Sequence, residues 1–151
     1  MSEKKIKKAE EIVNSRTAAV RLGAGVCLSL LDHEGYPTTS CLSISKADGI
    51  RQIYFAADLT SNKAKRAAAC SRASLCLFDD KEDSYYNITL VGDVEIITDP
   101  AVKKDVWYDE GCAEHFPNGG MDDPNYCVLR FTTKRYSLWL DFEEEATTGS
   151  F

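Results

Sequence analysis

The chain has 151 residues, 44% of them hydrophobic and 28% charged, and a formal net charge of −6 at pH 7. A chain of this length buries one core, so we expect a single domain over residues 1–151. The negative charge disfavours a nucleic-acid partner, because phosphate backbones are bound largely through clustered Lys and Arg. No stretch reaches the roughly 18 consecutive apolar residues of a membrane span, and the first residues do not form an apolar signal core. We therefore expect a soluble, cytoplasmic protein that binds neither nucleic acid nor membrane.

The six cysteines are widely spaced and contain no C-x-x-C pair: Cys27, Cys41, Cys70, Cys76, Cys112 and Cys127. Most of them lie inside apolar runs, which is typical of free thiols packed as small hydrophobic side chains in a reducing compartment. Their spacing fits neither a disulfide framework nor a metal site. We expect six reduced cysteines and no bound metal.

The first third of the chain predicts a helix followed by antiparallel strands. Residues 3–17 carry apolar side chains at helical spacing among Lys and Glu, which predicts a helix with one buried stripe: Ile6, Ala9, Ile12 and Val13. Strand patterns follow over residues 25–31, 36–45 and 52–57, with turn signals between them. We expect a three-stranded meander here.

The middle of the chain mixes helical and strand patterns. Residues 59–70 are rich in Ala and predict a helix, with Thr60 and Ser61 available to cap its first turn. Strands are expected over residues 73–78 and 85–97, where Gly92 predicts a bulge or bend. Asp99 and Pro100 are typical of the cap and first position of a further helix. Trp107 and Tyr108, which follow that helix, are expected to be packing residues.

The last third contains a long loop, two strands and a tail. Residues 110–125 hold three Gly and two Pro, which predicts a loop that is functional or mobile. Strands are expected over residues 127–133 and 135–142, followed by a flexible acidic tail over residues 143–151. About seven strands with scattered helices predict a mainly β fold with helical insertions, a six- to seven-stranded antiparallel barrel. The motifs of several common enzyme classes, such as G-x-G-x-x-G and H-E-x-x-H, are absent.

Three strings, in this order, carry a resemblance to a known family. The first is Gly35-Tyr36-Pro37 with the strand that follows it; the second is the strand-to-helix turn that contains Ser61-Asn62-Lys63; the third covers residues 123–131 and 135–139. Together they resemble the pyridoxamine 5'-phosphate oxidase-like proteins, especially their general stress protein-like branch. The resemblance runs from the first helix to about Phe142. It implies a flavin mononucleotide (FMN)-binding split β-barrel that forms a homodimer with two FMN sites, each built from both subunits.

The resemblance also implies which residues bind FMN. The strand after the Gly-x-Pro turn runs beside the flavin ring, the Ser-x-Lys turn holds the phosphate, and a Trp lies next to the flavin: Ser40, Cys41, Leu42, Ser43, Ala57, Thr60, Ser61, Asn62, Lys63 and Trp139. Elementary chemistry supports the second of these, because a helix start offers free N–H groups and a positive dipole end to an anion. The alternatives are an ordinary cap at Ser61, a solvated Lys63, a strand whose hydroxyls face solvent, and a Trp139 that only packs.

The chain departs from the oxidases proper in ways that bear on the substrate. Asn62 and Ser40 stand where those enzymes have Arg, and residues 143–145 are Glu where they have a substrate-binding Arg and His cluster. Pyridoxamine phosphate is therefore a doubtful substrate, and the catalytic residues are unknown. His33 and His115 lack metal spacing and receive no catalytic role, although the fold could bring His115 to the mouth of a cleft.

The resemblance implies an FMN-dependent oxidoreductase that moves hydride or electrons between a nicotinamide or other donor and a small acceptor. One alternative is a non-catalytic protein that binds FMN, haem or another planar ligand for storage or sensing. A second alternative is a degenerate barrel that acts only as an interaction or stress-response module.

Overall fold

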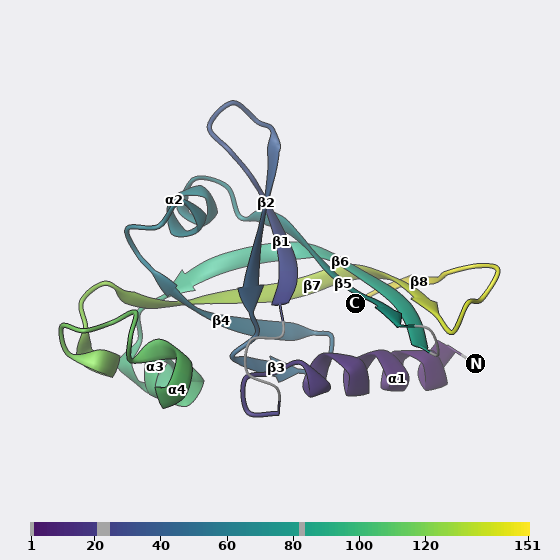
Figure 1. The fold of residues 1–151 in the computed structure, drawn as a ribbon. Helices are drawn as coiled ribbons and strands as arrows, with labels where there is room; N and C mark the ends of the chain where they lie inside the picture. The colour runs from purple at the N-terminus through teal and green to yellow at the C-terminus, as the bar shows by residue number, and fades with distance from the viewer. Residues whose placement is uncertain (1, 21–24, 82–83) are drawn as a thin grey trace.

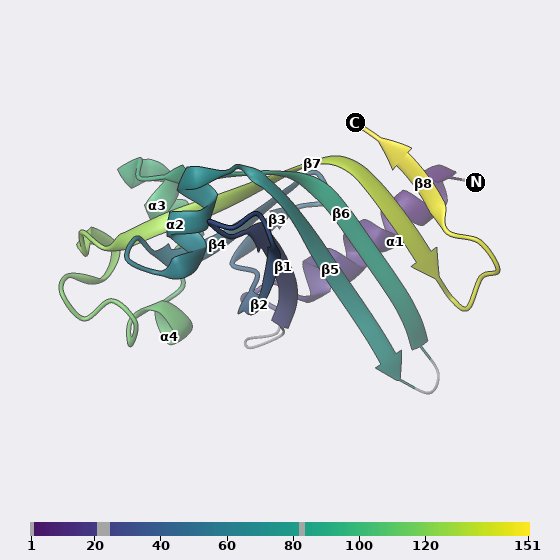
Figure 2. The same ribbon diagram turned by 90° about the horizontal axis from the view of Figure 1, so that it is seen from above.

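The structure is a computed structural model that describes residues 2–20, 25–81 and 84–151. Its strands form one antiparallel sheet in the order β2-β1-β5-β6-β7-β4-β3, and β8 pairs with β7. The strands are β1 (Gly25–Leu31), β2 (Pro37–Ser43), β3 (Lys46–Asp48), β4 (Gln52–Asp58), β5 (Arg72–Lys81), β6 (Ser84–Ile97), β7 (Tyr126–Leu140) and β8 (Thr147–Ser150). The helices are α1 (Ser2–Ser15), α2 (Asn62–Ala69), α3 (Pro100–Val106), α4 (Asp109–Cys112) and the 3-10 turn η1 (Gly120–Asp122). The sheet curls into a half barrel (Figure 1, Figure 2), which confirms the predicted mainly β split-barrel fold with helical insertions.

β7 is one long strand where the sequence predicts two. Its ladder with β6 passes from Gly92 opposite Thr133 to Val91 opposite Arg135, so the strand continues through a bulge instead of ending. The predicted irregularity at Gly92 is confirmed. A Cβ atom at Gly92 would lie 1.9 Å from the carbonyl oxygen of Thr132, a distance that no side chain tolerates.

The predicted flexible tail over residues 143–151 is wrong for its second half. Thr147–Ser150 form β8, in register with residues 135–138 of β7. The ring of Phe151 packs on Tyr136, with ring centroids 5.4 Å apart, and the Arg51 guanidinium lies 4.4 Å from the Phe151 centroid. The Thr residues suit a strand, but four residues are too few for a period-2 pattern to be recognised.

The core lies on one face of the sheet and is closed by α1. Along β1, Val26, Leu28 and Leu30 are buried, while the residues between them are half-buried. The α1 side chains Ala9 and Val13 are fully buried against this face, as the helical spacing predicts. We call this the core face of the sheet and the opposite side the outer face.

A second apolar cluster covers the outer face at one end of β4 and β7. Tyr126 and Val128 of β7 pack there with Val106, Cys112 and Phe116 from the α3–α4 region. This end lies opposite the end that carries β8 and both termini (Figure 1, Figure 2). The predicted loop over residues 110–125 is therefore partly helical, because α4 and η1 anchor it to the sheet.

The segment that follows β2, at one edge of the sheet, is hydrogen-bonded to β4, near the other edge. The Ser45 N–H donates to the Tyr54 carbonyl (2.9 Å), and the Ala56 N–H donates to the Ser45 hydroxyl (3.1 Å). These bonds attach the chain after β2 to β4, although β2 itself has only β1 as a strand neighbour. A gap therefore remains between β2 and the end of β4.

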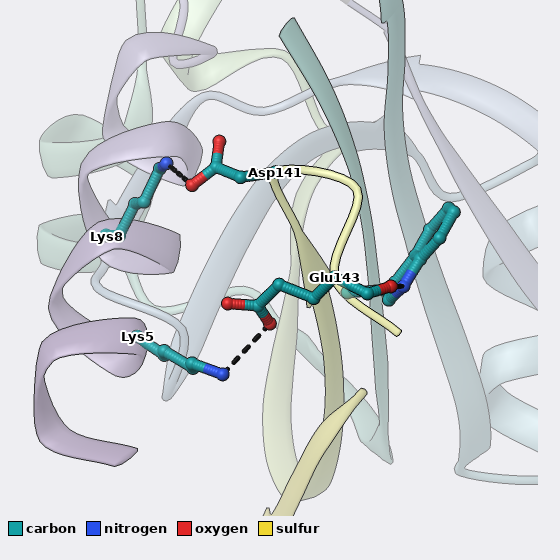
Figure 3. A network of polar contacts seen from close by, with 5 residues as sticks. Lys5, Lys8, Asp141 and Glu143 are labelled. Atoms are coloured by element: carbon teal, nitrogen blue, oxygen red, sulfur yellow. Dashed lines mark hydrogen bonds and ion pairs between the residues drawn. The ribbon is translucent and has the colours of Figure 1, made fainter. Parts of the chain in front are cut away.

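At the far end, α1 is tied to the turn that follows β7. The Lys5 ammonium lies 2.9 Å from the Glu143 carboxylate, and Lys8 forms an ion pair with Asp141 (Figure 3). The turn is unusual, since Asp141 and Phe142 have φ angles of 55° and 57°, in the left-handed region. Contacts to α1 thus hold a turn that the backbone alone disfavours. None of the helices within the described residues has the length and hydropathy needed to cross a membrane.

Candidate functional site

The gap between β2 and β4 contains a pocket of about 370 Å³. Its walls come from β2, the end of β4, the start of α2 and the α4 region: Cys41, Leu42, Ser43, Ala56, Ala57, Asp58, Ser61, Lys63, Tyr108, Gly111, Cys112, His115 and Phe116. This volume is typical of small-molecule sites, which occupy about 300–1,000 Å³. Six of the ten predicted FMN-binding residues lie in these walls.

The start of α2 brings free backbone N–H groups and a lysine to one end of the pocket. Ser61 is the N-cap, and its hydroxyl accepts the Ala64 N–H at 3.3 Å. The first helical bond runs from the Lys65 N–H to the Ser61 carbonyl (3.1 Å), so the Asn62 and Lys63 N–H groups precede the helical ladder. These two N–H groups and the helix dipole favour a negative charge, and the Lys63 side chain adds a cation to the pocket wall.

Asp58 fixes the turn that leads into α2. One of its carboxylate oxygens accepts both the Thr60 N–H (2.7 Å) and the Thr60 hydroxyl (2.6 Å). These bonds to Thr60 lower the pKa of Asp58, so the carboxylate is ionised at neutral pH. Because Asp58 also lines the pocket, its negative charge opposes an anion there and increases the importance of Lys63.

The β2 wall of the pocket is a strand with a free backbone edge. Cys41, Leu42 and Ser43 belong to the outermost strand of the sheet, which has β1 on one side only. On the other side, alternate N–H and C=O groups of an edge strand have no strand partner. A planar heteroaromatic ligand would find both donors and acceptors along this edge.

The α4 wall is apolar and was not foreseen as part of a site. The Tyr108 ring lies where a Cβ atom at Gly111 would stand, only 2.1 Å from the nearest ring atom, so the glycine makes room for the ring. Burial raises the pKa values of Tyr108 and Cys112, and both groups therefore stay protonated at neutral pH. His115 and Phe116 complete this wall. Tyr108 was predicted only to pack. The length of the 110–125 loop and the chance that the fold brings His115 to the mouth of a cleft were the signals that pointed to function.

Four of the predicted residues lie outside the pocket walls. Ser40 is in register with the fully buried Leu28 and therefore points to the core face, opposite to its neighbour Cys41. Thr60 bonds to Asp58 instead of lining the pocket. Asn62 lines a different hollow that also contains His33 and Lys65.

Trp139, the fourth, lies near the far end of β7. Its ring packs edge-on against Tyr85, with centroids 4.9 Å apart, and its indole N–H donates to the Glu143 carbonyl. The pocket instead borders Ala57, which is in register with Cys127 near the start of β7. Eleven strand residues separate Cys127 from Trp139, a path of roughly 40 Å along β7. Within one subunit Trp139 therefore packs, and it reaches a flavin only if a second subunit brings the two together.

The cysteines differ more in environment than their apolar neighbours in the sequence suggest. All six are free thiols, but only Cys112 and Cys127 are buried, whereas Cys41 is exposed. The expectation that they pack as small hydrophobes is thus wrong for Cys41, because every second residue of an edge strand faces outward. Across the described parts of the chain, no cluster of three or more His, Cys, Asp or Glu is arranged to hold a metal ion.

The chain is thus a split antiparallel half barrel with a pocket in its gap and the start of a helix in the pocket wall. The model of the family described as pyridoxamine 5'-phosphate oxidase like matches residues 6–149. The chain therefore belongs to the pyridoxamine 5'-phosphate oxidase-like family, as the three sequence strings predict. No curated protein sequence matches the chain.

Solved structures show the same fold. A Clostridium acetobutylicum protein related to general stress protein 26 has a TM-score of 0.79 at 24% identity, covering 100% of this chain and 97% of its own. General stress protein 26 from Bacillus anthracis gives 0.74 at 16% identity, covering 97% and 98%. A haem-binding protein from Mycobacterium smegmatis gives 0.72 at 15% identity, covering 97% of this chain and 57% of its own. At these identities the likeness concerns the fold alone.

Proposed function

We propose that this protein binds FMN in the β2–β4 pocket and transfers hydride or electrons between a nicotinamide or other donor and a small acceptor. The observation that carries the proposal is the joining of three features in one pocket: the α2 start, the Lys63 side chain and the free edge of β2. FMN presents the matching chemistry, since it has an anionic phosphate at one end and a planar ring with a hydrogen-bonding edge at the other. Family membership supports the same ligand.

The pocket offers only a few groups that could bind the phosphate of FMN. The hydroxyl of Ser61 and the N–H groups of Asn62 and Lys63 would face the phosphate, and the Lys63 ammonium would supply the positive charge. Since Asp58 is ionised nearby and Asn62 carries no charge, Lys63 is the principal cation of this end. Its loss should therefore be difficult to compensate.

The ring end would lie between β2 and the α4 wall. The backbone of residues 41–43 would hydrogen-bond the pyrimidine part of the ring, and the apolar faces of Tyr108 and Phe116 would exclude water from it. Bound FMN itself supplies the hydride and electron chemistry, while the protein sets its orientation and environment. Because the Tyr108 and Cys112 pKa values are raised, these groups act as neutral hydrogen-bonding partners and not as bases.

The proposal includes a cytoplasmic homodimer with shared cofactor sites. Members of this family often dimerise. Two observations support a partner subunit here: the Phe78 ring at the end of β5 is 52% exposed, and Trp139 is too far from the pocket of its own subunit to contact a ligand there. Free thiols at six positions suit a reducing compartment. Sedimentation equilibrium at micromolar concentration should give twice the mass of the chain, and a monomer would contradict shared sites.

Haem is a second candidate ligand, because one wall of the pocket contains residue types that can ligate iron. Tyr108, Cys112 and His115 all line it, and each is a residue type that ligates haem iron in proteins. The likeness to a mycobacterial haem-binding protein adds to this alternative. A haem protein of this kind would store or sense its ligand without the proposed hydride transfer.

The visible absorption spectrum of freshly purified protein separates the candidates. Flavin bands that bleach when NADH or NADPH is added anaerobically support the proposed oxidoreductase. Flavin bands that no donor bleaches favour a binding protein, and an intense Soret band favours haem. If apo-protein takes up neither ligand in a titration, the proposed function is wrong.

A further inference from the structure

Three of the six cysteines lie in one row on the outer face of the sheet. Cys27 in β1 is directly opposite Cys41 in β2 on one side and Cys76 in β5 on the other. The neighbours of Cys27 along the strand, Val26 and Leu28, are buried in the core face, so Cys27 projects from the outer face. The strand order β2-β1-β5 thus aligns three thiols that are far apart in sequence.

The two sulfur atoms of Cys27 and Cys41 are in contact, 3.7 Å apart. Directly opposite residues in an antiparallel pair have Cα atoms about 4.5–5.5 Å apart, which lies within the range of about 4.4–6.8 Å found in disulfides. A bond between these sulfurs therefore needs side-chain rotation and no displacement of the strands. The next pair on the same face, Ser29 and Thr39, is joined by a 2.7 Å hydrogen bond that holds the two strands in this register.

Exposure makes the two thiols unequal. Cys41 is exposed and lines the β2–β4 pocket, so it meets a dissolved oxidant first. Cys27 is only partly exposed, and burial together with the hydrogen bond to Cys41 raises its pKa. Cys27 is therefore the poorer nucleophile toward peroxide. Its contact with the Cys41 sulfur suits it to the second step, in which it attacks an already oxidised Cys41.

Cys76 is the less suitable partner for Cys27. Its thiol donates to the Asn87 side-chain oxygen, at 3.8 Å, and so points toward β6. A metal ion held by the three thiols is also disfavoured, because the described residues contain no metal-binding arrangement of three such groups. Of the three thiols, those of Cys27 and Cys41 are therefore the pair placed to react with each other.

We propose that Cys41 and Cys27 form a peroxide-reactive dithiol that closes to a reversible cross-strand disulfide. The Cys41 thiolate attacks one oxygen of hydrogen peroxide, the O–O bond breaks, and the leaving hydroxide takes up a proton as water, which leaves a sulfenic acid on Cys41. The Cys27 sulfur then attacks the Cys41 sulfur, the S–O bond breaks, and the departing hydroxide leaves as water with the Cys27 proton. The two thiols lose two electrons and two protons, and one peroxide becomes two waters.

Oxidation would also change the wall of the β2–β4 pocket. Cys41 lines this pocket, and its sulfur would move toward Cys27 to form the bond. The dithiol proposal rests on the contact between the two sulfur atoms, an observation separate from those that support FMN binding.

The experiment treats the fully reduced protein with hydrogen peroxide and then alkylates the remaining thiols after denaturation. No Lys or Arg separates Cys27 from Cys41, but Glu34 does, so a glutamate-specific protease cuts between them. The expected product has lost two hydrogen atoms, carries two fewer alkyl groups, and yields the Cys27 and Cys41 peptides as one linked species. Dithiothreitol should restore the two separate peptides. Peptides that stay separate after peroxide, or a link from Cys27 to Cys76, would overturn the proposal.

Single Ser variants test the order of the two steps. Cys27→Ser should accumulate a sulfenic acid on Cys41 that dimedone traps, and Cys41→Ser should slow the first reaction with peroxide by about tenfold or more. Cys70→Ser is the matched control, because Cys70 has the same intermediate exposure as Cys27; it should form the disulfide at the wild-type rate. Loss of the linked product in Cys70→Ser, or unchanged peroxide reactivity in Cys41→Ser, would contradict the assignment.

Discussion

The helices α1 and α2 have similar lysine-rich sequences, but their lysines have different surroundings. In α1, Lys5 and Lys8 form ion pairs with the turn after β7 (Figure 3), while the opposite stripe of the helix closes the core. In α2, Lys63 lines the β2–β4 pocket, and no ion pair within the described part of the chain involves it. The first helix is therefore tied to the fold along its side, whereas the second has its start in the wall of the pocket.

This difference shows that the role of a lysine depends on which part of the helix faces the sheet. The long α1, with 14 residues, lies along the core and contributes through its side. The short α2, with 8 residues, contributes through its N-terminal end, where backbone N–H groups are free. Changes in α1 should therefore alter stability, and changes at the start of α2 should alter ligand binding.

The largest expected effect is the loss of stability caused by a charge in the buried stripe of α1. Val13 is fully buried, and Val13→Asp would place an unpaired carboxylate in the core. We expect the free energy of unfolding to fall by about 4 kcal/mol, measured by urea denaturation. The control Lys7→Asp, on the exposed side of the same helix, should change it by about 0.5 kcal/mol or less. Similar losses in both variants would show that α1 does not pack as described.

An intermediate effect is expected from removal of the α2 cap. Ser61→Ala deprives the Ala64 N–H of its acceptor and should cost about 1 kcal/mol of stability, and it should also weaken FMN binding. The matched control is Asp99→Ala, which removes the side-chain cap of α3 but lies outside the pocket walls. The control should lose comparable stability in thermal unfolding and keep its FMN affinity. A parallel loss of affinity in both variants would mean that the cap acts on binding only through general stability.

The smallest expected effect concerns the Lys5–Glu143 ion pair of α1. Both side chains are 28% exposed, so a double-mutant cycle with Lys5→Ala and Glu143→Ala should give a coupling energy of about 0.5 kcal/mol. Replacement of the Glu143 side chain leaves its carbonyl available to Trp139, so the cycle isolates the ion pair. The coupling should shrink further in 0.5 M salt, at roughly a 4–5 Å screening length. A large coupling energy that does not depend on salt would contradict this prediction, because it would mean that the ion pair is shielded from water.

Much of the fold follows from local sequence signals. Asp99 and Pro100 begin α3 as predicted, and Ser61 caps α2, because capping depends on side-chain and backbone chemistry within a few residues. The sequence signals failed where pairing with distant residues decides the structure. β8 forms because β7 offers a free edge to residues 147–150, and β7 is continuous because β6 pairs with it across the bulge.

The site was predictable on its polar side and not on its apolar side. Ser61 and Lys63 lie next to each other in sequence, and a helix start brings them to one point without help from the rest of the fold. Tyr108 and His115 reach the same pocket only because the second apolar cluster anchors the 110–125 segment to β4 and β7. Ser40 lies outside the pocket walls, and a strand with polar residues at successive positions does not reveal which of them faces the pocket.

The measurement that tests the central claim most directly compares Lys63→Ala with Lys65→Ala in FMN titrations of apo-protein followed by flavin fluorescence. Lys65 belongs to the same helix but lies in the neighbouring hollow, away from the pocket. A charge-assisted contact to phosphate is worth about 1.5–3 kcal/mol, so Lys63→Ala should raise the dissociation constant roughly ten- to a hundredfold. Lys65→Ala should bind FMN like the wild type, and both variants should unfold at the wild-type temperature. Equal FMN affinities for the wild type and Lys63→Ala would contradict the assignment of the α2 start as the phosphate site.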